Sequence, residues 1–204
     1  MLPLTSLRFF AAFYVLLFHT LREAFSLDHG PVATWIGAGY VSVSFFFTLS
    51  GYILAYVYLL QGKAIDKRRF WLARVARIYP VFLLTMLLDF PFAVLNRLDH
   101  LSLFRAIEKV AGGLFVECMM LQAWHLNWRV LDPPNWSLSV EAFFYLLFPF
   151  LGVVLWRWRT SQLFGTIAVI WLLGMGASSL ALHLGAAEKA VMFNPILHAP
   201  EFVG

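Results

Sequence analysis

The chain of 204 residues is too apolar for an ordinary soluble domain, since 61% of its residues are hydrophobic and only 13% are charged. Soluble domains usually contain about 45–50% apolar and about 25% charged residues. The composition therefore predicts an all-α, polytopic membrane protein, a transmembrane helical bundle with roughly five to seven spans. With one cysteine and six histidines in no metal-ligand spacing, we expect neither an internal disulfide nor a metal site.

The first segment, residues 4–21, contains a ten-residue apolar run with Arg8 before it and His19 after it. On an α-helix, eleven positions at about 100° each return to within about 20° of the starting direction. Arg8 and His19 would therefore lie on one face, about 16 Å apart along the axis. Because ionisable side chains are costly to bury in a membrane, this alignment predicts a functional stripe.

This segment also has simpler interpretations. A basic residue, an apolar run and the small-x-small sequence at 24–26 are typical of a signal peptide, although the bulky aromatic residues and the spans that follow favour a membrane helix. Arg8 has the position of an interface anchor, and a lone His19 is compatible with a hydrogen-bonded packing role. At mid-membrane depth, a neutral His19 would instead suit a general base for a hydroxyl nucleophile.

The stretch from residue 30 to residue 62 has no charged residue and predicts a second span around residues 40–54. Ser44, Thr48 and Gly51 follow one another at helical spacing, which favours close helix packing through small residues.

Six of the fifteen Lys and Arg residues lie in the next run, Lys63–Arg77. Between two spans, such a run predicts a cytoplasmic loop rather than a nucleic-acid surface. The N-terminus would then be cytoplasmic too, with Arg8 at the cytoplasmic end of the first span. His19 would lie about halfway across a hydrocarbon core of ~30 Å.

Further spans are predicted after the basic run. We expect Pro80 in the first turn of one helix, whose end is marked by Asp89 and Pro91, and a kink at Pro149 in a later one. For residues 105–124, a span, a re-entrant helix and an interfacial helix remain open. The predicted spans are residues 78–88, residues 136–156 and the stretch 160–187.

Two arginines and a short polar motif stand out beside these spans. Arg74 and Arg77 are three residues apart, so on a helix they face the same way and offer two guanidinium forks for phosphate oxygens. Charge that only fixes topology needs no such spacing. Trp136 and Ser137 begin the helix that carries Glu141. The Glu141 carboxylate either stabilises this helix by interacting with the positive N-terminal end of its dipole or belongs to a functional site.

Several separated segments together resemble membrane-bound acyltransferase family 3, the O-acyltransferases of cell-surface glycans and other hydroxylated substrates. The resemblance covers residues 1–204 as a single transmembrane acyltransferase domain. Because the family's domain has more spans, we expect a member that is truncated at its C-terminus. The segments are Arg8 with His19, residues 43–52, residues 74–80, residues 136–149, and the closing Pro200–Gly204.

The resemblance implies an enzyme of the cytoplasmic (inner) membrane that transfers an acyl group, often acetyl, from acyl-CoA to a hydroxyl of a carbohydrate or another surface or secondary-metabolite acceptor. Acyl-CoA is the co-substrate, and no further cofactor and no nucleic acid are implied. An extended CoA arm would be long enough to reach both Arg8 and His19. Catalytic roles are implied for His19, Arg8 and Glu141, and substrate-binding roles for Arg74, Arg77, Tyr79, Trp136 and Ser137.

Two other classes of protein remain open from the residues. In a proton-coupled transporter, His19, Asp89 and Glu141 would form a pathway, although no inverted repeat is visible in the sequence. A non-catalytic membrane assembly protein would keep the helices without the chemistry. CoA-dependent acyl transfer by membranes that carry the protein distinguishes the enzyme from both.

Overall fold

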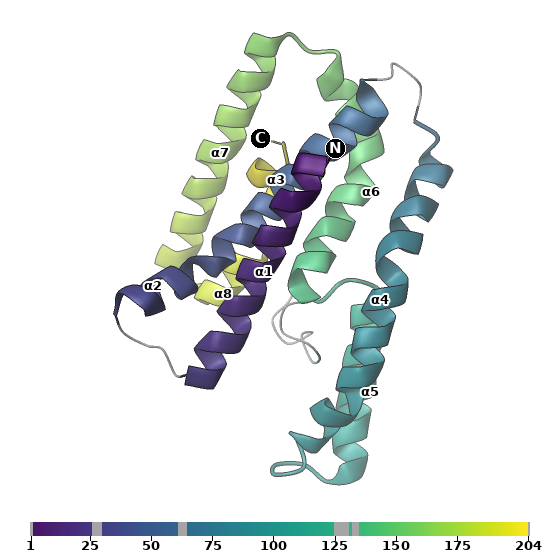
Figure 1. Cartoon of the computed structure of the whole chain (residues 1–204), viewed down its shortest axis with the longest axis vertical. Coiled ribbons are helices and arrows are strands. Elements are labelled where there is room, and N and C mark those ends of the chain that lie inside the picture. The colour runs from purple at the N-terminus through teal and green to yellow at the C-terminus, as the bar shows by residue number, and fades with distance from the viewer. Residues whose placement is uncertain (1, 26–29, 61–64, 125–130, 132–134, 204) are drawn as a thin grey trace. The chain divides into compact units, whose positions relative to one another are not determined.

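Every regular element that the structure describes is a helix (Figure 1). The computed structural model describes residues 2–25, 30–60, 65–124, 131 and 135–203, and for residues 2, 3, 5 and 22–25 the backbone alone. Four helical stretches in this part are long and apolar enough to cross a membrane, and Ser6–Leu21 is a shorter apolar helix. The prediction of an all-α chain with several membrane helices is confirmed. The four stretches are Pro31–Leu59, Lys67–Leu95, Trp136–Trp156 and Thr160–His183.

The chain divides into two compact units, Met1–Val57 with Glu201–Gly204, and Tyr58–Pro200. The elements of the first unit are α1 (Leu2–Phe25), α2 (Pro31–Gly37), the 3₁₀ turn η1 (Ala38–Tyr40), α3 (Val41–Leu54) and most of α9 (Ala199–Val203). The elements of the second are α4 (Lys67–Leu95), α5 (Leu103–Cys118), α6 (Trp136–Trp156), α7 (Thr160–His183) and α8 (Glu188–Phe193). A π-helical turn, η2 (Ala55–Leu59), contains the boundary between the units.

In the first unit, α1 packs on α2, η1 and α3. The approach is closest at Gly39, where a Cβ atom would lie 2.5 Å from the Cβ of Phe18, so only glycine fits without a shift. The Tyr14 hydroxyl donates to the carbonyl of Trp35, and the two rings lie 4.9 Å apart. These contacts hold the middle of α1 against the corner between α2 and α3.

The small-residue stripe on α3 is where the chain's last residues pack. The Ser44 hydroxyl donates to a carboxylate oxygen of Glu201 at 2.9 Å. Two turns further along, a Cβ atom on Gly51 would lie 2.0 Å from the carbonyl oxygen of Phe202, so the backbone of α9 occupies the space that a side chain would fill. The prediction that this stripe serves close helix packing is confirmed at Ser44 and Gly51.

In the second unit, α4 begins eleven residues earlier than predicted, at Lys67. Asp66 caps it, because its carboxylate accepts a hydrogen bond from the backbone N–H of Arg69 at 3.2 Å. The basic run is therefore largely helical, and the placement of Pro80 in a first turn is wrong, since Pro80 and Pro91 both lie inside the helix. Prolines inside membrane helices are tolerated where neighbouring groups satisfy the backbone.

A second helix, α5, packs against α4 and forms the core of this unit. At 16 residues, α5 is not among the four candidate spans, and it covers most of the region that the sequence left open. The core residues share near-complete burial: Phe82, Met86, Ala93, Val94, Ala106, Val110 and Leu131.

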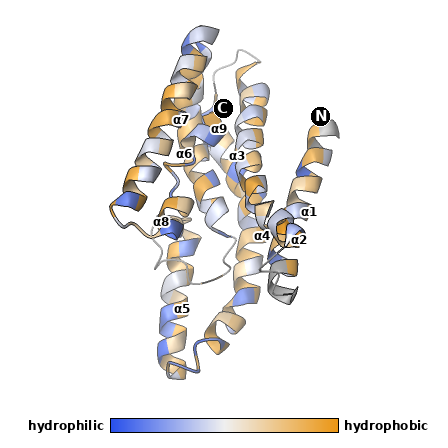
Figure 2. Cartoon of the chain, turned by 90° about the vertical axis from the view of Figure 1, so that its left-hand side faces the viewer, coloured by the Kyte–Doolittle hydropathy of each residue, from blue (hydrophilic) through white to orange (hydrophobic). Residues whose placement is uncertain are grey.

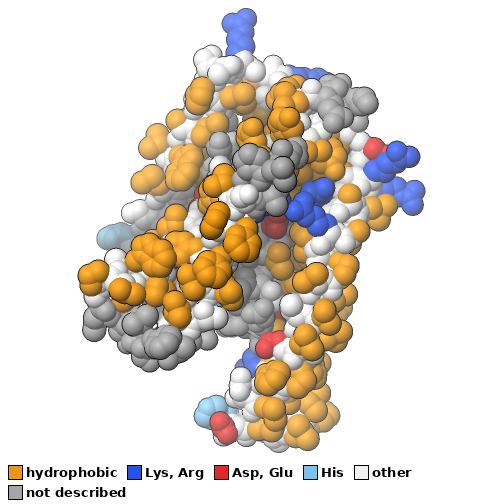
Figure 3. Space-filling model, in the orientation of Figure 1, with side chains coloured by type: hydrophobic (Ala, Val, Ile, Leu, Met, Phe, Trp, Pro, Cys, Tyr) orange, Lys and Arg blue, Asp and Glu red, His pale blue; other side chains and the backbone are white. Residues whose placement is uncertain are grey.

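Elsewhere the helices expose their apolar side chains, as expected for surfaces that face lipid. Figure 2 shows apolar residues along most of α6 and α7, and Figure 3 shows hydrophobic side chains over much of the visible face. In α7, no residue is buried. The predicted span at residues 160–187 is confirmed as α7, and the predicted helix at 136–156 as α6, with Pro149 in its interior.

Candidate functional site

Arg8 and His19 lie on one continuous helix, as predicted, because α1 includes both positions. Both side chains are half-buried, as are Ala11 and Val15 between them at helical spacing. Phe9, Phe10 and Phe13, which lie between them in sequence, are instead exposed, Phe9 and Phe10 by about two thirds of their surface. The two ionisable groups therefore occupy the less exposed side of α1, about 16 Å apart along its axis.

Arg74 occupies a half-buried position on α4, where three aromatic rings surround its guanidinium group. The guanidinium carbon lies 5.9 Å from the ring centre of Tyr58, 5.8 Å from that of Phe70 and 5.7 Å from that of Tyr145. These distances are within the range of cation–π attraction. One turn along, Arg77 is exposed, so the pair combines one enclosed and one accessible cation.

Glu141 is linked to this cluster through Tyr145, one turn later on α6. The Tyr145 hydroxyl donates a hydrogen bond to the Glu141 carboxylate, while the ring of Tyr145 lies beside Arg74. Thus two of the predicted site residues interact with the same tyrosine side chain, Arg74 with its ring and Glu141 with its hydroxyl.

Tyr79 has a different environment from the two arginines. Its hydroxyl donates to the carbonyl of Cys118, which joins α4 to the end of α5. This bond uses the hydroxyl proton of Tyr79 inside the protein, so any contact of Tyr79 with a substrate would involve the ring or the remaining lone pairs.

Trp136 is buried at the start of α6, with its ring 4.8 Å from that of Phe193 and 5.4 Å from that of His198. The Nε2 atom of His198 lies 2.7 Å from the carbonyl oxygen of Met192, the distance of a hydrogen bond. Ser137, the next residue, is half-buried. Trp136 therefore anchors α6 to the segment that follows α8.

A buried polar junction fixes the start of α6 relative to α5. The side-chain amide of Gln122 donates to the carbonyl of Asn135 at 2.8 Å, and the Ser139 hydroxyl donates to the carbonyl of Met120. A carboxylate oxygen of Glu117 accepts from the backbone N–H of Leu131 at 2.8 Å. These bonds satisfy backbone groups in the non-helical connection, which is required where water is excluded.

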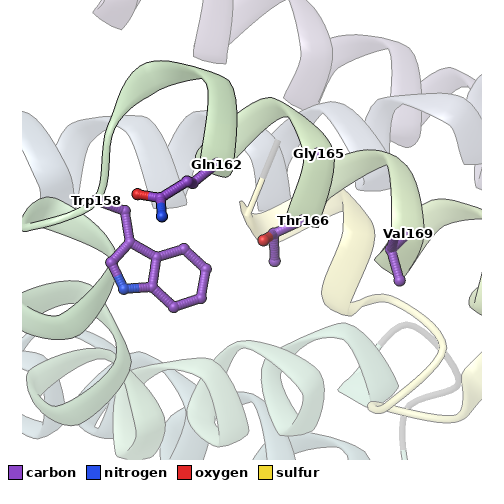
Figure 4. A pocket seen from close by; sticks show the side chains of 5 residues that line it. All are labelled: Trp158, Gln162, Gly165, Thr166 and Val169. Atoms are coloured by element: carbon purple, nitrogen blue, oxygen red, sulfur yellow. The ribbon is translucent and has the colours of Figure 1, made fainter.

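One open pocket follows a side of α7 (Figure 4). Trp158, Gln162, Gly165, Thr166 and Val169 line it, and none of them is ionisable. The pocket thus contains none of the predicted acid–base or phosphate-binding residues. In the described part of the chain, no group of three or more His, Cys, Asp and Glu residues is placed to hold a metal ion.

Sequence reasoning missed the residues that surround Arg74. Phe70 lies one turn before it on α4 and was detectable by helical spacing. Tyr58 precedes α4, and Tyr145 is on α6, so neither has a fixed spacing from Arg74. The contact of Glu201 with Ser44 was likewise invisible, because the two residues are 157 positions apart.

The candidate membrane spans define the broad class, an integral-membrane protein. The profile of acyltransferase family 3, described as "Acyltransferase domain", matches residues 4–203. The chain therefore belongs to this family.

Among its relatives, acyltransferase MdmB of Streptomyces mycarofaciens is 35% identical over 155 residues, which is 72% of this chain and 38% of that protein. O-acetyltransferase OatA of Staphylococcus aureus is 24% identical over 94% of this chain and 31% of its own length. Peptidoglycan O-acetyltransferase OatA of Listeria monocytogenes is 25% identical over 61% of this chain and 21% of its own length. The matches cover between about a fifth and two fifths of these relatives. No solved structure matches the chain.

Proposed function

We propose that this chain acts in an O-acyltransferase of the cytoplasmic membrane. The enzyme transfers an acyl group, which we take to be acetyl, from acyl-CoA to a hydroxyl of a carbohydrate or a related acceptor. The observation that carries the proposal is the half-buried alignment of Arg8 and His19 on α1 in a member of acyltransferase family 3. Relatives that are named O-acetyltransferases support acetyl as the group, and the name of the Listeria relative supports a glycan acceptor.

In this proposal, His19 is the general base. Its imidazole takes the proton of the acceptor hydroxyl, whose oxygen attacks the carbonyl carbon of the thioester. A new C–O bond forms, the C–S bond breaks, and the CoA thiolate leaves and is protonated. Arg8 provides a fixed positive charge on the same side of α1 for an anionic part of a substrate.

Arg74 and Arg77 would bind phosphate oxygens of the CoA moiety. Both lie in the first part of α4, close to the exposed basic residues Lys67, Arg68 and Arg69. By the positive-inside rule this end of α4 is cytoplasmic, as is the N-terminus, and acyl-CoA is supplied from that side. Glu141, Tyr79, Trp136 and Ser137 would support substrate binding, in a transmembrane domain with roughly five to seven spans in this chain.

The test uses membranes from cells that express the protein with His19→Ala, and His100→Ala as the matched control. His100 is an exposed histidine in the connection between α4 and α5. We expect His19→Ala to reduce CoA-dependent acyl transfer by about 100-fold or more, the usual contribution of a general base, and His100→Ala to leave it unchanged. Insertion is checked by quantitative immunoblotting of the membrane fraction.

Full transfer activity of the His19→Ala protein would refute the general-base role. A protein that transfers no acyl group in any form, but shows proton-linked uptake that depends on Asp89 and Glu141, would instead support a transporter. The phosphate role is tested separately, because Arg74→Ala with Arg77→Ala should weaken acyl-CoA binding without changing expression. Unchanged CoA affinity would refute it.

A further inference from the structure

The strongest unexplained feature of the second unit is the environment of Arg74. Its Nη2 atom is 3.4 Å from the hydroxyl of Tyr58, a long hydrogen bond, and its Nε atom is buried without a hydrogen-bond partner. In the described part of the chain, no carboxylate lies within ion-pair distance of Arg74. Two ion pairs elsewhere in this unit, Arg69 with Asp66 and Arg105 with Glu108, are exposed.

Three rings alone do not replace the hydrogen bonds that the half-buried guanidinium of Arg74 would make in water, because its Nε–H is buried without an acceptor. Ring faces also cannot accept the guanidinium N–H groups in the way that an oxyanion can. A phosphate oxygen bound by the guanidinium would supply the negative charge and the hydrogen-bond acceptor that the rings lack.

The rings around Arg74 are themselves held by other contacts. Phe70, which is 1% exposed, stacks on Phe148 with ring centres 5.5 Å apart. The ring of Tyr58 lies edge-on to Phe70 at 5.0 Å. The cage therefore belongs to a wider aromatic cluster rather than to three mobile side chains.

Tyr145 is fixed at both of its ends. Its hydroxyl donates to Glu141, and its backbone carbonyl accepts a hydrogen bond from the indole N–H of Trp71 at 3.0 Å. The second bond joins α6 directly to α4, which lie side by side (Figure 1). The position of the Tyr145 ring relative to Arg74 is thus set by both helices.

We infer that Tyr58, Phe70 and Tyr145 are positioning residues, which hold the guanidinium of Arg74 preorganised for one phosphate group of the acyl donor. This inference rests on the proposed function, and it assigns to Glu141 the task of orienting Tyr145. A preformed cage lowers the entropy lost when the long arginine side chain becomes fixed on binding. Arg77 is exposed and has no such cage. It attracts the same phosphate group but orients it less.

The experiment compares acetyl-CoA with acetyl-pantetheine, a donor that has the same thioester and no phosphate. Purified protein in lipid nanodiscs is assayed with each donor for Tyr145→Leu, Tyr145→Phe and, as the control, Phe92→Leu. Phe92 is on α4, the helix that carries Arg74, but its side chain is 64% exposed. We expect Tyr145→Leu to raise KM for acetyl-CoA about 5- to 30-fold, the equivalent of one cation–π contact in a desolvated site, with little change in kcat.

The same variant should change the kinetics with acetyl-pantetheine by less than about twofold, because that donor does not use Arg74. Tyr145→Phe keeps the ring but loses the hydroxyl that Glu141 holds, so its KM for acetyl-CoA should rise by less than that of Tyr145→Leu, with no change for acetyl-pantetheine. Phe92→Leu should stay close to the unsubstituted protein with both donors. If Tyr145→Leu is too unstable to assay, Tyr58→Leu removes another ring of the cage, and the same donor-specific rise in KM is expected.

The outcomes separate the inference from the function on which it rests. If Arg74→Ala raises KM for acetyl-CoA and the ring substitutions do not, the positioning role is refuted while the phosphate role stands. An equal loss with both donors would show a structural role and would also overturn the inference. If Arg74→Ala itself leaves KM for acetyl-CoA unchanged, the proposed phosphate contact of Arg74 is refuted, and the positioning role is refuted with it.

Discussion

Gly51 offers a direct test of how the chain's last residues pack on α3. In a Gly51→Ala protein, the new Cβ atom would lie 2.0 Å from the carbonyl oxygen of Phe202. Non-bonded heavy atoms are most favourably about 3.5–4.0 Å apart, so α3 or α9 must move by more than ~1 Å. The obstructing atom belongs to the backbone and cannot rotate away. Overpacking of this kind typically costs about 1–3 kcal/mol.

The assay is thermal unfolding of the detergent-solubilised protein, followed by tryptophan fluorescence. For a chain of this size, ~1 kcal/mol shifts Tm by about 2–4 °C, so we expect a decrease of about 2–12 °C. Gly176→Ala on α7 is the matched control, because its added Cβ meets no described heavy atom within 4 Å other than those of Gly176, its two neighbours and the local helix backbone. Both substitutions carry the same gain in helix propensity. Equal Tm values for the two variants would refute the close contact between Gly51 and Phe202.

Two further predictions concern the ends of helices in the second unit. Asp66→Ala removes the acceptor for the Arg69 N–H and should lower the free energy of unfolding by about 0.5–2 kcal/mol. Asp66→Asn keeps a side-chain oxygen and should retain most of the capping stabilisation. Equal losses for the two variants in chemical denaturation would argue against capping. Burial, together with the neighbouring Glu117 carboxylate, raises the pKa of the Cys118 thiol. Because the thiolate is the reactive form, alkylation of the native protein should reach its half-maximal rate at a higher pH than that of the denatured protein. Coincident pH profiles would contradict the raised pKa.

Much of the helical fold follows from the distribution of apolar and charged residues. The uncharged stretches predicted α3 and α7, and the apolar run that follows Glu141 predicted α6, because the bilayer requires long apolar helices with satisfied backbones. The start of α4 was misplaced, since the basic run was interpreted as a loop and Pro80 as a first-turn proline. The capping residue Asp66 was a usable signal for the true start.

The candidate site was predictable only where its residues share one helix. Arg8 with His19, and Arg74 with Arg77, follow from helical periodicity alone. The rings of Tyr58 and Tyr145 reach Arg74 through tertiary packing, which spacing along the chain does not encode. For the same reason, the small residues of α3 indicated that something packs closely there, but not that it would be Glu201 and Phe202.

The return of residues 201–203 to α3 has a consequence for the order of assembly. Ser44 and Glu201 are separated by 157 residues, and every helix of the second unit lies between them in the chain. During synthesis, α1 and α3 leave the ribosome long before their last contacts exist. Closing a flexible loop of that length costs about 4–5 kcal/mol in chain entropy, which nearby contacts must later offset. The space beside Gly51 therefore stays unfilled until residues 201–203 have been synthesised, which is after every helix of the second unit.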